Sequence, residues 1–347
     1  MEDLTEASAG SQYPAYNFTP LATFGNVEAK AIHEPLISQI ARESAARFAP
    51  RMRDDGIVPR LRNHVARRGG EQSFYLVAAG ILDGNDPLID KGMRGNETGA
   101  ADFDANGIHT FSDDRPHMLV KRSTIFLHGA VRAVLLLLTH DNVAPVFRER
   151  ALALLPKMHA IVSNLATPEN VAMIPDIAPN RGFLAGAVFQ EIGLLTGDDS
   201  LVKIARQVME NTLTLQRNDG VFPEKGGSDT AYHSLSLFFL CRYVAMAADP
   251  EFRSIVLAAG QRGMDWLTAR IDDNGVIDVS ENTRVGPKGA KFLRGQRGAV
   301  SIGGQHSPQH IAYFGYLTGQ QDKYYPIAAK VHAMNKQRIG ANEDDDE

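Results

Sequence analysis

The sequence predicts an all-α protein built from antiparallel pairs of helices, and three observations support this prediction. Apolar residues recur at spacings of three and four along most of the chain, which is the period of a helix with one buried face. Short breaks such as Thr196-Gly197 separate neighbouring helical segments, so consecutive helices are expected to run antiparallel. Longer connections carry a recurring Asn-Gly or Asp-Gly turn in front of a β-branched residue.

The helical segments follow one another from residue 32 to residue 334. They cover residues 32–48, 118–138, 146–165, 183–195, 201–215, 232–246, 252–271, 311–317 and 324–334. The breaks at Thr196-Gly197, Ala248-Asp249-Pro250 and Thr318-Gly319 each join two of these segments into a hairpin. Residues 50–116 form the least regular part of the pattern.

The recurring turns lie at Asp104–Ile108, Arg217–Val221 and Asp272–Val276, and the last two start 55 residues apart. One helix pair per roughly 50 residues, with short turns at one end and long loops at the other, is typical of an α/α toroid. In that fold the inner helices surround a central funnel. A stacked solenoid of helix pairs is the alternative, because repeats alone do not show closure into a ring.

Composition narrows the function classes. Lys plus Arg number 36 against 41 for Asp plus Glu, and this net charge of −5 argues against a nucleic-acid partner. The longest apolar run, Ala133–Leu138, is far shorter than the roughly 20 residues that span a bilayer, so we expect no membrane partner. The one cysteine, Cys241, excludes an internal disulfide and any site with two thiolates. Nucleotide, dinucleotide, zinc-protease and serine-hydrolase motifs are absent, and we expect no cofactor and no metal.

With 347 residues, 44% of them hydrophobic, the chain is long enough to bury one large core. We expect an N-terminal extension at 1–27, a single toroid domain at 28–338 and a disordered acidic tail at 339–347. The first residues, Met1 to Glu6, lack the apolar core of a signal peptide. This leaves two alternatives, a cytoplasmic protein or a secreted or periplasmic mature form without its signal peptide, and we expect the second.

Two polar segments lie where long loops lead into the next helix. In residues 220–233, Ser228 or Asp229 is placed to cap a helix whose first turn holds Tyr232 and His233, where the helix dipole favours a phenolate or a substrate carboxylate. The alternative is a tyrosine that packs the loop and a solvated histidine. In residues 175–183, Asn180 and Arg181 precede a helix and either bind an anion or serve as a helix cap and a surface charge.

A third segment, residues 286–298, is cationic. Four charges within ten residues predict an anion-binding loop on this net-negative protein, or else a solvated loop; they are Lys288, Lys291, Arg294 and Arg297. His306 follows this loop. A further polar run, residues 109–122, contributes four contacts for an acidic ligand: His109, Arg115, His117 and Lys121.

The spacing of these segments resembles that of the α/α-toroid polysaccharide lyases, in particular the alginate and glucuronan lyases. Those families pair an Asn and a His at one inner-helix start with an Arg and a Tyr about 50 residues later. Asn180 matches the Asn and Tyr232 the Tyr, whereas Arg181 stands in place of the His and Lys225 near the place of the Arg. The resemblance covers about residues 118–320.

The resemblance implies a lyase that cleaves an acidic, uronic-acid-containing polysaccharide by β-elimination. Asn180 with Arg181 or Lys225 would neutralise the substrate carboxylate, so that the neighbouring proton becomes acidic enough to remove. Tyr232 would then transfer the proton as base, acid or both, with His233 or His117 as a separate base. Lys291, Arg294, Arg297 and His306 would hold further sugars of the chain.

Two other functions stay open at this point. A glycoside hydrolase on the same fold, for example one acting on unsaturated uronides, needs two carboxylates across the scissile bond. The chain offers Asp113 or Asp114, Glu224, Asp229, Asp278 and Glu281. A non-catalytic protein that binds acidic polysaccharide is the other alternative.

Overall fold

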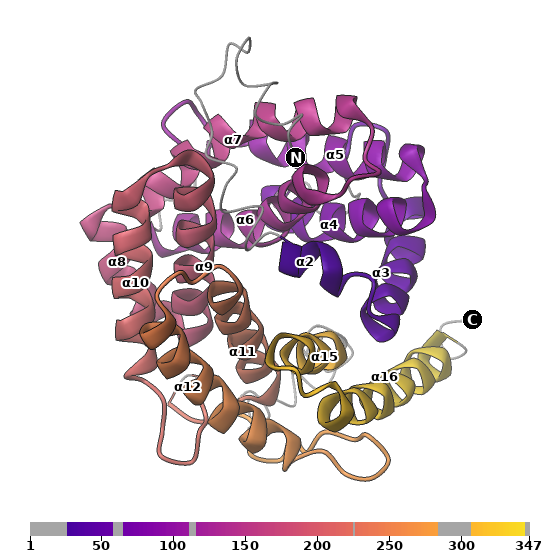
Figure 1. Cartoon of the computed structure of the whole chain (residues 1–347), viewed down its shortest axis with the longest axis vertical. Coiled ribbons are helices and arrows are strands. Elements are labelled where there is room, and N and C mark those ends of the chain that lie inside the picture. Colours follow the sequence, from indigo (N-terminus) through magenta and orange to yellow (C-terminus); the bar gives the residue numbers. More distant parts are fainter. Residues whose placement is uncertain (1–25, 58–64, 111–115, 225, 284–306, 344–347) are drawn as a thin grey trace. The chain divides into compact units, whose positions relative to one another are not determined.

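The computed structural model describes residues 26–57, 65–110, 116–224, 226–283 and 307–343 (Figure 1). Most of them are helical, and β-type pairing in these ranges is limited to isolated bridges. This confirms the predicted all-α class. The chain separates into two compact units: unit 1 comprises residues 1–177 and 184–209, and unit 2 comprises residues 178–183 and 210–347. The boundaries expected at residues 28 and 338 stay a prediction.

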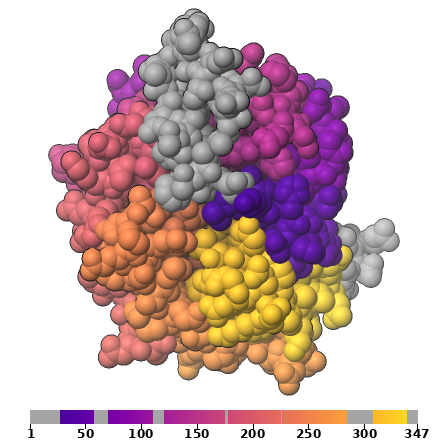
Figure 2. All heavy atoms as spheres, viewed as in Figure 1, coloured from indigo at the N-terminus to yellow at the C-terminus, as the bar shows by residue number. Residues whose placement is uncertain are grey.

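Each helix expected from the apolar period is present, with shifted ends. Unit 1 holds α2 (Asn26–Ala31), α3 (Pro35–Phe48), the short 3₁₀ helix η3 (Ala49–Arg51), α4 (Val65–Asp83), α5 (Asp86–Ala101), α6 (Pro116–Thr139), α7 (Pro145–Leu165), α8 (Pro168–Ile177), most of α9 (Pro179–Thr196) and most of α10 (Asp199–Leu213). Unit 2 holds the start of α9, the end of α10, α11 (Thr230–Ala245), α12 (Pro250–Thr268), α15 (Ser307–Thr318) and α16 (Gln321–Glu343). Within unit 2, α15 and α16 pack on each other and form one continuous surface (Figure 2).

Residues 50–116, the least regular part of the apolar pattern, nevertheless contain α4 and α5, which pack as a hairpin. Glycines at the helix contacts weaken the apolar period here. A Cβ built on Gly70 would lie 2.1 Å from the carbonyl oxygen of Phe126 in α6, and one on Gly92 would lie 2.8 Å from the carbonyl oxygen of Ser73 in α4. Backbones this close need glycine, which contributes no apolar signal to the sequence.

The three predicted turns share one geometry, and a fourth copy occurs at residues 53–57. In each copy the first N–H donates to the carbonyl of the fifth residue, and the fourth residue is a glycine with positive φ. At Gly220, with φ 96°, a Cβ would lie 2.5 Å from the Arg262 carbonyl oxygen of α12, so the close approach requires glycine. The other three turns approach α5, α7 and α16 equally closely. Each turn therefore packs on the second helix of the hairpin that follows it.

Helix α6 is the core helix of unit 1. Among the described helices it alone is long and apolar enough, over Val120–Thr139, to cross a membrane, but 89% of that window is buried inside the protein. It packs against α2, α4, α7 and α8. This burial is that of a helix inside a folded core.

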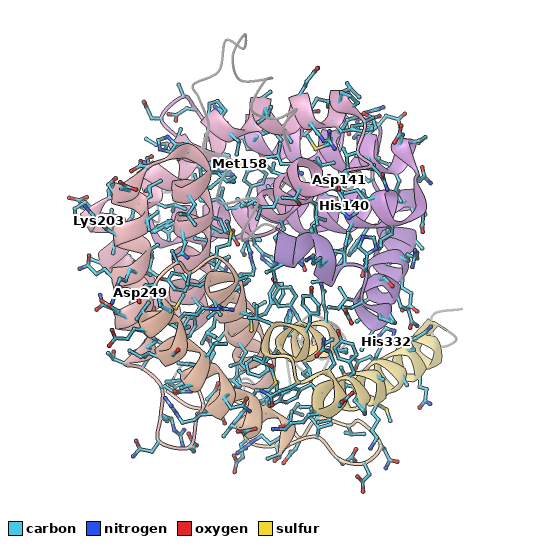
Figure 3. All side chains as sticks on the ribbon, in the orientation of Figure 1. His140, Asp141, Met158, Lys203, Asp249 and His332 are labelled. Atoms are coloured by element: carbon cyan, nitrogen blue, oxygen red, sulfur yellow. The ribbon has the colours of Figure 1, made fainter. Side chains whose placement is uncertain are left out.

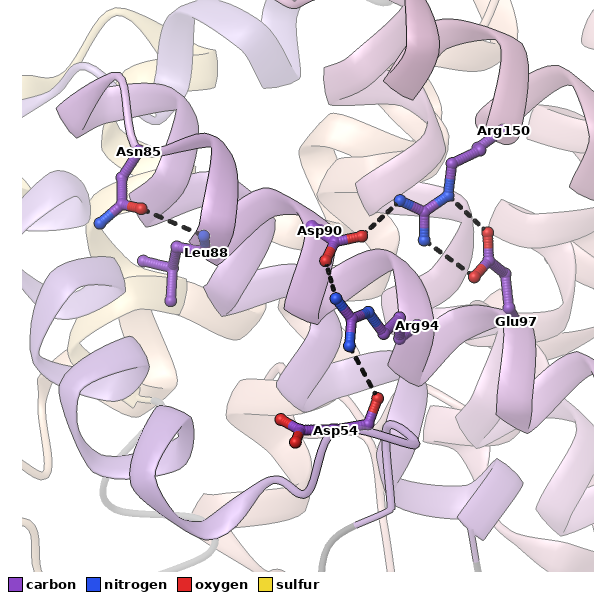
Figure 4. A network of polar contacts seen from close by, with 7 residues as sticks. All are labelled: Asp54, Asn85, Leu88, Asp90, Arg94, Glu97 and Arg150. Atoms are coloured by element: carbon purple, nitrogen blue, oxygen red, sulfur yellow. Dashed lines mark hydrogen bonds and ion pairs between the residues drawn. The ribbon is translucent and has the colours of Figure 1, made fainter.

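Ion pairs hold α5 on α7 at the surface of unit 1. Arg150 donates to both carboxylate oxygens of Glu97, at 2.7 and 2.8 Å, and to Asp90 at 2.7 Å (Figure 4). Arg94 pairs with Asp90 and donates to the carbonyl oxygen of Asp54 in the first of the recurring turns. Because these groups are partly exposed, solvent screens each pair and its contribution to stability is small.

Candidate functional site at the helix starts of unit 2

Asp229 caps α11 and thereby orients Tyr232. The Asp229 carboxylate accepts hydrogen bonds from the N–H groups of Ala231 and Tyr232, both at 3.1 Å. The prediction that Ser228 or Asp229 caps this helix is confirmed. Tyr232 is the third residue of the helix and is half-buried, and its carbonyl oxygen accepts a hydrogen bond from Ser236 Oγ at 2.9 Å. The main chain of Tyr232 is therefore fixed on both sides.

His233 is a structural residue, and the expectation that it faces solvent or acts as a base is corrected. It is fully buried; its Nδ1 accepts from the N–H of Phe222 at 3.1 Å, and its Nε2 donates to the carbonyl oxygen of Gly263 at 2.8 Å. Burial lowers its pKa to about 4, which the Gly263 carbonyl opposes. With both nitrogens bonded to the main chain, the ring has no free lone pair for a substrate proton.

The first turn of α9 buries an amide that has no partner. The helix begins at Pro179 and the N–H of Arg181 donates to the carbonyl oxygen of Ala178, so Asn180 is the second helical residue and not the cap. Asn180 is 1% exposed, and neither atom of its carboxamide has a hydrogen-bond partner among the residues that the structure describes. Arg181 is also buried, which excludes its interpretation as an exposed surface charge.

A chain of aromatic rings joins the starts of α9 and α11. Phe183 packs edge-on against Phe222, with ring centroids 4.6 Å apart, and Phe222 stacks on His233 at 5.8 Å. The ring of His233 in turn meets Trp266 of α12 edge-on at 4.8 Å. Asn180 thus lies one turn before one end of this chain, and Tyr232 lies next to a ring within it.

The start of α15 is a third polar helix start, and it was not predicted from the sequence. Ser307, Gln309 and His310 are all buried there. Nδ1 of His310 lies 2.8 Å from Ser234 Oγ of α11, and its ring stacks on Phe238 with centroids 4.7 Å apart. The sequence pattern that could have predicted it is a cluster of polar residues ahead of an apolar helix, as at the starts of α9 and α11. Exposed N–H groups and the helix dipole make such starts favourable sites for an anion.

Two loops meet in front of α11. The N–H of Thr230 donates to the side-chain oxygen of Asn282 at 3.0 Å, and the Asn282 amide donates back to Thr230 Oγ1 at 3.0 Å. The N–H of Thr283 donates to the carbonyl oxygen of Ser228 at 2.8 Å. The loop at residues 278–283 therefore braces the cap of α11.

The carboxylates considered for a hydrolase differ in their surroundings. Asp229 is occupied as the helix cap, and hydrogen bonds from Ser280 hold the pKa of Asp278 below its usual value. Glu281 is 71% exposed and pairs with Arg270 at 3.3 Å. Glu224 is buried in the loop before α11. Asp113 and Asp114 lie outside the described residues.

The remaining predicted contacts lie in unit 1 or outside the described residues. Lys121 is half-buried on α6 of unit 1, and His117 lies near the start of the same helix. Outside the described residues lie Arg115, Lys225, Lys288, Lys291, Arg294, Arg297 and His306. Their predicted roles stay predictions. In the described ranges no group of three His, Cys, Asp or Glu side chains could hold a metal ion.

Two solved structures share this architecture. A glycosyl hydrolase of family 88 from Bacteroides vulgatus matches with a TM-score of 0.56 and 11% identity, over 85% of this chain and 82% of the hydrolase. A mutant chondroitin AC lyase from Streptomyces coelicolor A3 matches with a TM-score of 0.58 and 12% identity, over 90% of this chain and 48% of the lyase, so this chain spans about half of it. The fold is an α/α toroid. No family model matches the chain, and no curated protein does.

The α/α-toroid prediction is thus confirmed and the stacked-solenoid alternative set aside. Both neighbours are enzymes, one a hydrolase and one a lyase. At 11 and 12% identity the likeness establishes the fold alone, and the resemblance to the alginate and glucuronan type of lyase finds no support in it.

Proposed function

We propose that this α/α-toroid protein is a polysaccharide lyase that cleaves a uronic-acid-containing polymer by β-elimination at the helix starts of unit 2. The observation that carries the proposal is the unpartnered, buried carboxamide of Asn180 in the first turn of α9. The lyase among the structural neighbours acts, by its name, on chondroitin.

The buried Asn180 amide lowers the free energy of unfolding of the protein without ligand. A buried polar group without a hydrogen bond destabilises a protein by about 1–3 kcal/mol. A ligand that accepts from its N–H₂ group recovers this cost, and a carboxylate that is gaining enolate character is a strong acceptor. Arg181, the next residue, would add positive charge, and the N-terminal end of α9 favours an anion.

Tyr232 is the proposed proton-transfer group. A tyrosine has an ordinary pKa near 10, so it needs a cationic setting to act as a base at neutral pH. Lys225, in the loop before α11, and the helix dipole would supply this setting. The base removes the proton beside the carboxylate, the electron pair forms the new double bond, and the linked sugar oxygen leaves with a proton.

The experiment uses a panel of uronic-acid polymers and follows ultraviolet absorbance, because elimination leaves a conjugated double bond. We expect absorbance to rise with one or more polymers. Asn180→Ala should lower turnover about 10²–10³-fold, as removal of a single oxyanion donor does, while leaving stability unchanged or higher. Asn211→Ala, at an exposed site at the end of α10, is the matched control and should retain activity. Full activity in Asn180→Ala would contradict the proposed site.

A glycoside hydrolase is the second candidate, since the family 88 hydrolase is matched over 82% of its length. Glu224 is the carboxylate that fits best, because it is buried in the loop before α11. A hydrolase would produce new reducing ends without ultraviolet absorbance, and Glu224→Gln would abolish them. A protein that only binds polysaccharide would yield neither signal.

A further inference from the structure

Two histidines face each other at a corner of unit 1. His33 lies in the loop between α2 and α3, and His140 directly follows α6 (labelled in Figure 3). Their Nε2 atoms are 3.0 Å apart, and their ring centroids are 5.0 Å apart. Two nitrogens at this distance form a hydrogen bond when one donates and the other accepts.

Either ring can donate in this contact, because the hydrogen bond needs only one protonated and one unprotonated Nε2. The contact links the end of α6 to the loop that leads into α3.

The groups around His140 favour the neutral form of its ring. Burial and the His33 ring lower the pKa of His140, while neighbouring Asp141 and the Ala29 backbone raise it to a smaller extent. From α7, Arg148 donates to the carbonyl oxygens of His140 and Asp141, at 2.7 and 2.9 Å. Beside His33 the chain carries Glu34.

We propose that His33 and His140 form a pH-operated clasp that fastens the corner between α2 and α3 to the end of α6. A pair with one neutral ring keeps the hydrogen bond; when both rings are protonated, two N–H groups face each other and the link breaks. Because the pKa of His140 is lowered in the closed corner, the clasp is fully formed above about pH 6.5 and weakens as the pH falls below that value.

Loss of the His33–His140 contact opens the corner only locally, because a second interaction still holds α2 on α6. Glu28 of α2 forms a buried ion pair with Arg132 of α6 at 2.6 Å, and the Arg132 guanidinium lies over the Phe74 ring at 3.5 Å. This ion pair joins α2 to α6 without a histidine. Acid should therefore free the His33 loop and the start of α3 first.

Native-state hydrogen exchange of the full chain between pH 7.5 and 5, corrected for intrinsic exchange and with a chelator present, tests the clasp. Amides at the end of α2 and the start of α3 should lose protection several-fold more than those of α5. In the His33→Gln variant the same amides should stay protected at pH 5, because the glutamine carboxamide can donate to neutral His140 and accept from the protonated His140 ring. His140→Ala should lack the protection at every pH.

His159→Gln is the matched control. His159 is a half-exposed histidine of α7 whose Nε2 lies 3.0 Å from an Asp198 oxygen. This variant should behave like the wild type at the corner. Equal protection of the wild-type corner at pH 7.5 and pH 5, or the same acid loss in His33→Gln, would overturn the proposal.

Discussion

Acid should destabilise unit 2 through His233, and replacement of this residue should remove that sensitivity. His233 is neutral in the fold because burial lowers its pKa from 6.5 to about 4. The unfolded chain takes up a proton first, so the contribution of His233 to stability is complete above pH 6.5 and is lost as the pH falls toward 4.

The magnitude follows from the two pKa values. The difference is about 2.5 pH units, which at 1.36 kcal/mol per unit gives about 3 kcal/mol. In His233→Asn the carboxamide oxygen can still accept from Phe222, but the hydrogen bond to Gly263 and the packing against Trp266 are lost. We expect the variant to be less stable than the wild type at pH 7.5 by about 2 kcal/mol or more. This difference should shrink at pH 4.5.

The assay is urea unfolding at pH 7.5, 6 and 4.5, followed by the fluorescence of Trp266. Trp266 is the one tryptophan of the chain, and its ring centroid lies 4.8 Å from that of His233. The signal therefore reports on unit 2 where the change is made. His159→Asn, at the half-exposed histidine of unit 1, provides the control and should retain the wild-type pH dependence. A stability difference between wild type and His233→Asn that is the same at all three pH values would refute the reasoning.

Three further predictions concern the site and its frame. Tyr232→Phe should keep the fold and lower kcat by about 10²–10⁴-fold if the hydroxyl transfers the proton, and retention of most turnover would remove Tyr232 from the mechanism. Gly220→Ala should destabilise the protein by about 2 kcal/mol or more in thermal or urea unfolding, and clearly more than Gly226→Ala, whose Cβ meets nothing within 4 Å. Neutralising Lys291 and Arg294 together should raise KM for an acidic polymer and weaken its salt dependence, and an unchanged salt dependence would favour a loop that faces solvent.

The helical frame was predictable because core helices carry a strong local signal. The segment at 118–138 follows the helical period so closely that α6 could be located from sequence alone. The hairpin of α4 and α5 was missed for the opposite reason, since Gly70 and Gly92 create close contacts without adding apolar residues. The turn at residues 53–57 carries Asp55-Gly56 before Ile57, which matches the Asn-Gly or Asp-Gly signal of the other three turns, and could have been recognised.

At the candidate site, local capping could be predicted and long-range burial could not. Asp229 follows the ordinary preference for aspartate at a helix start, and Pro179 would have placed Asn180 inside the first turn. The environment of His233 depends on main-chain groups of Phe222 and Gly263, which are 11 and 30 residues away in sequence. The missing partner of Asn180 is likewise a property of the packed structure and has no sequence signature.

The central claim, cleavage of a uronic-acid polymer by elimination, is tested most directly by the masses of the products. An oligosaccharide of defined length is incubated with the wild-type protein, and the fragments are weighed by mass spectrometry. Elimination adds no water, so the account predicts fragments whose masses sum to that of the substrate, with the fragment at the new non-reducing end lighter by one water than its saturated counterpart. Fragments whose masses sum to the substrate plus one water would show hydrolysis and contradict the account.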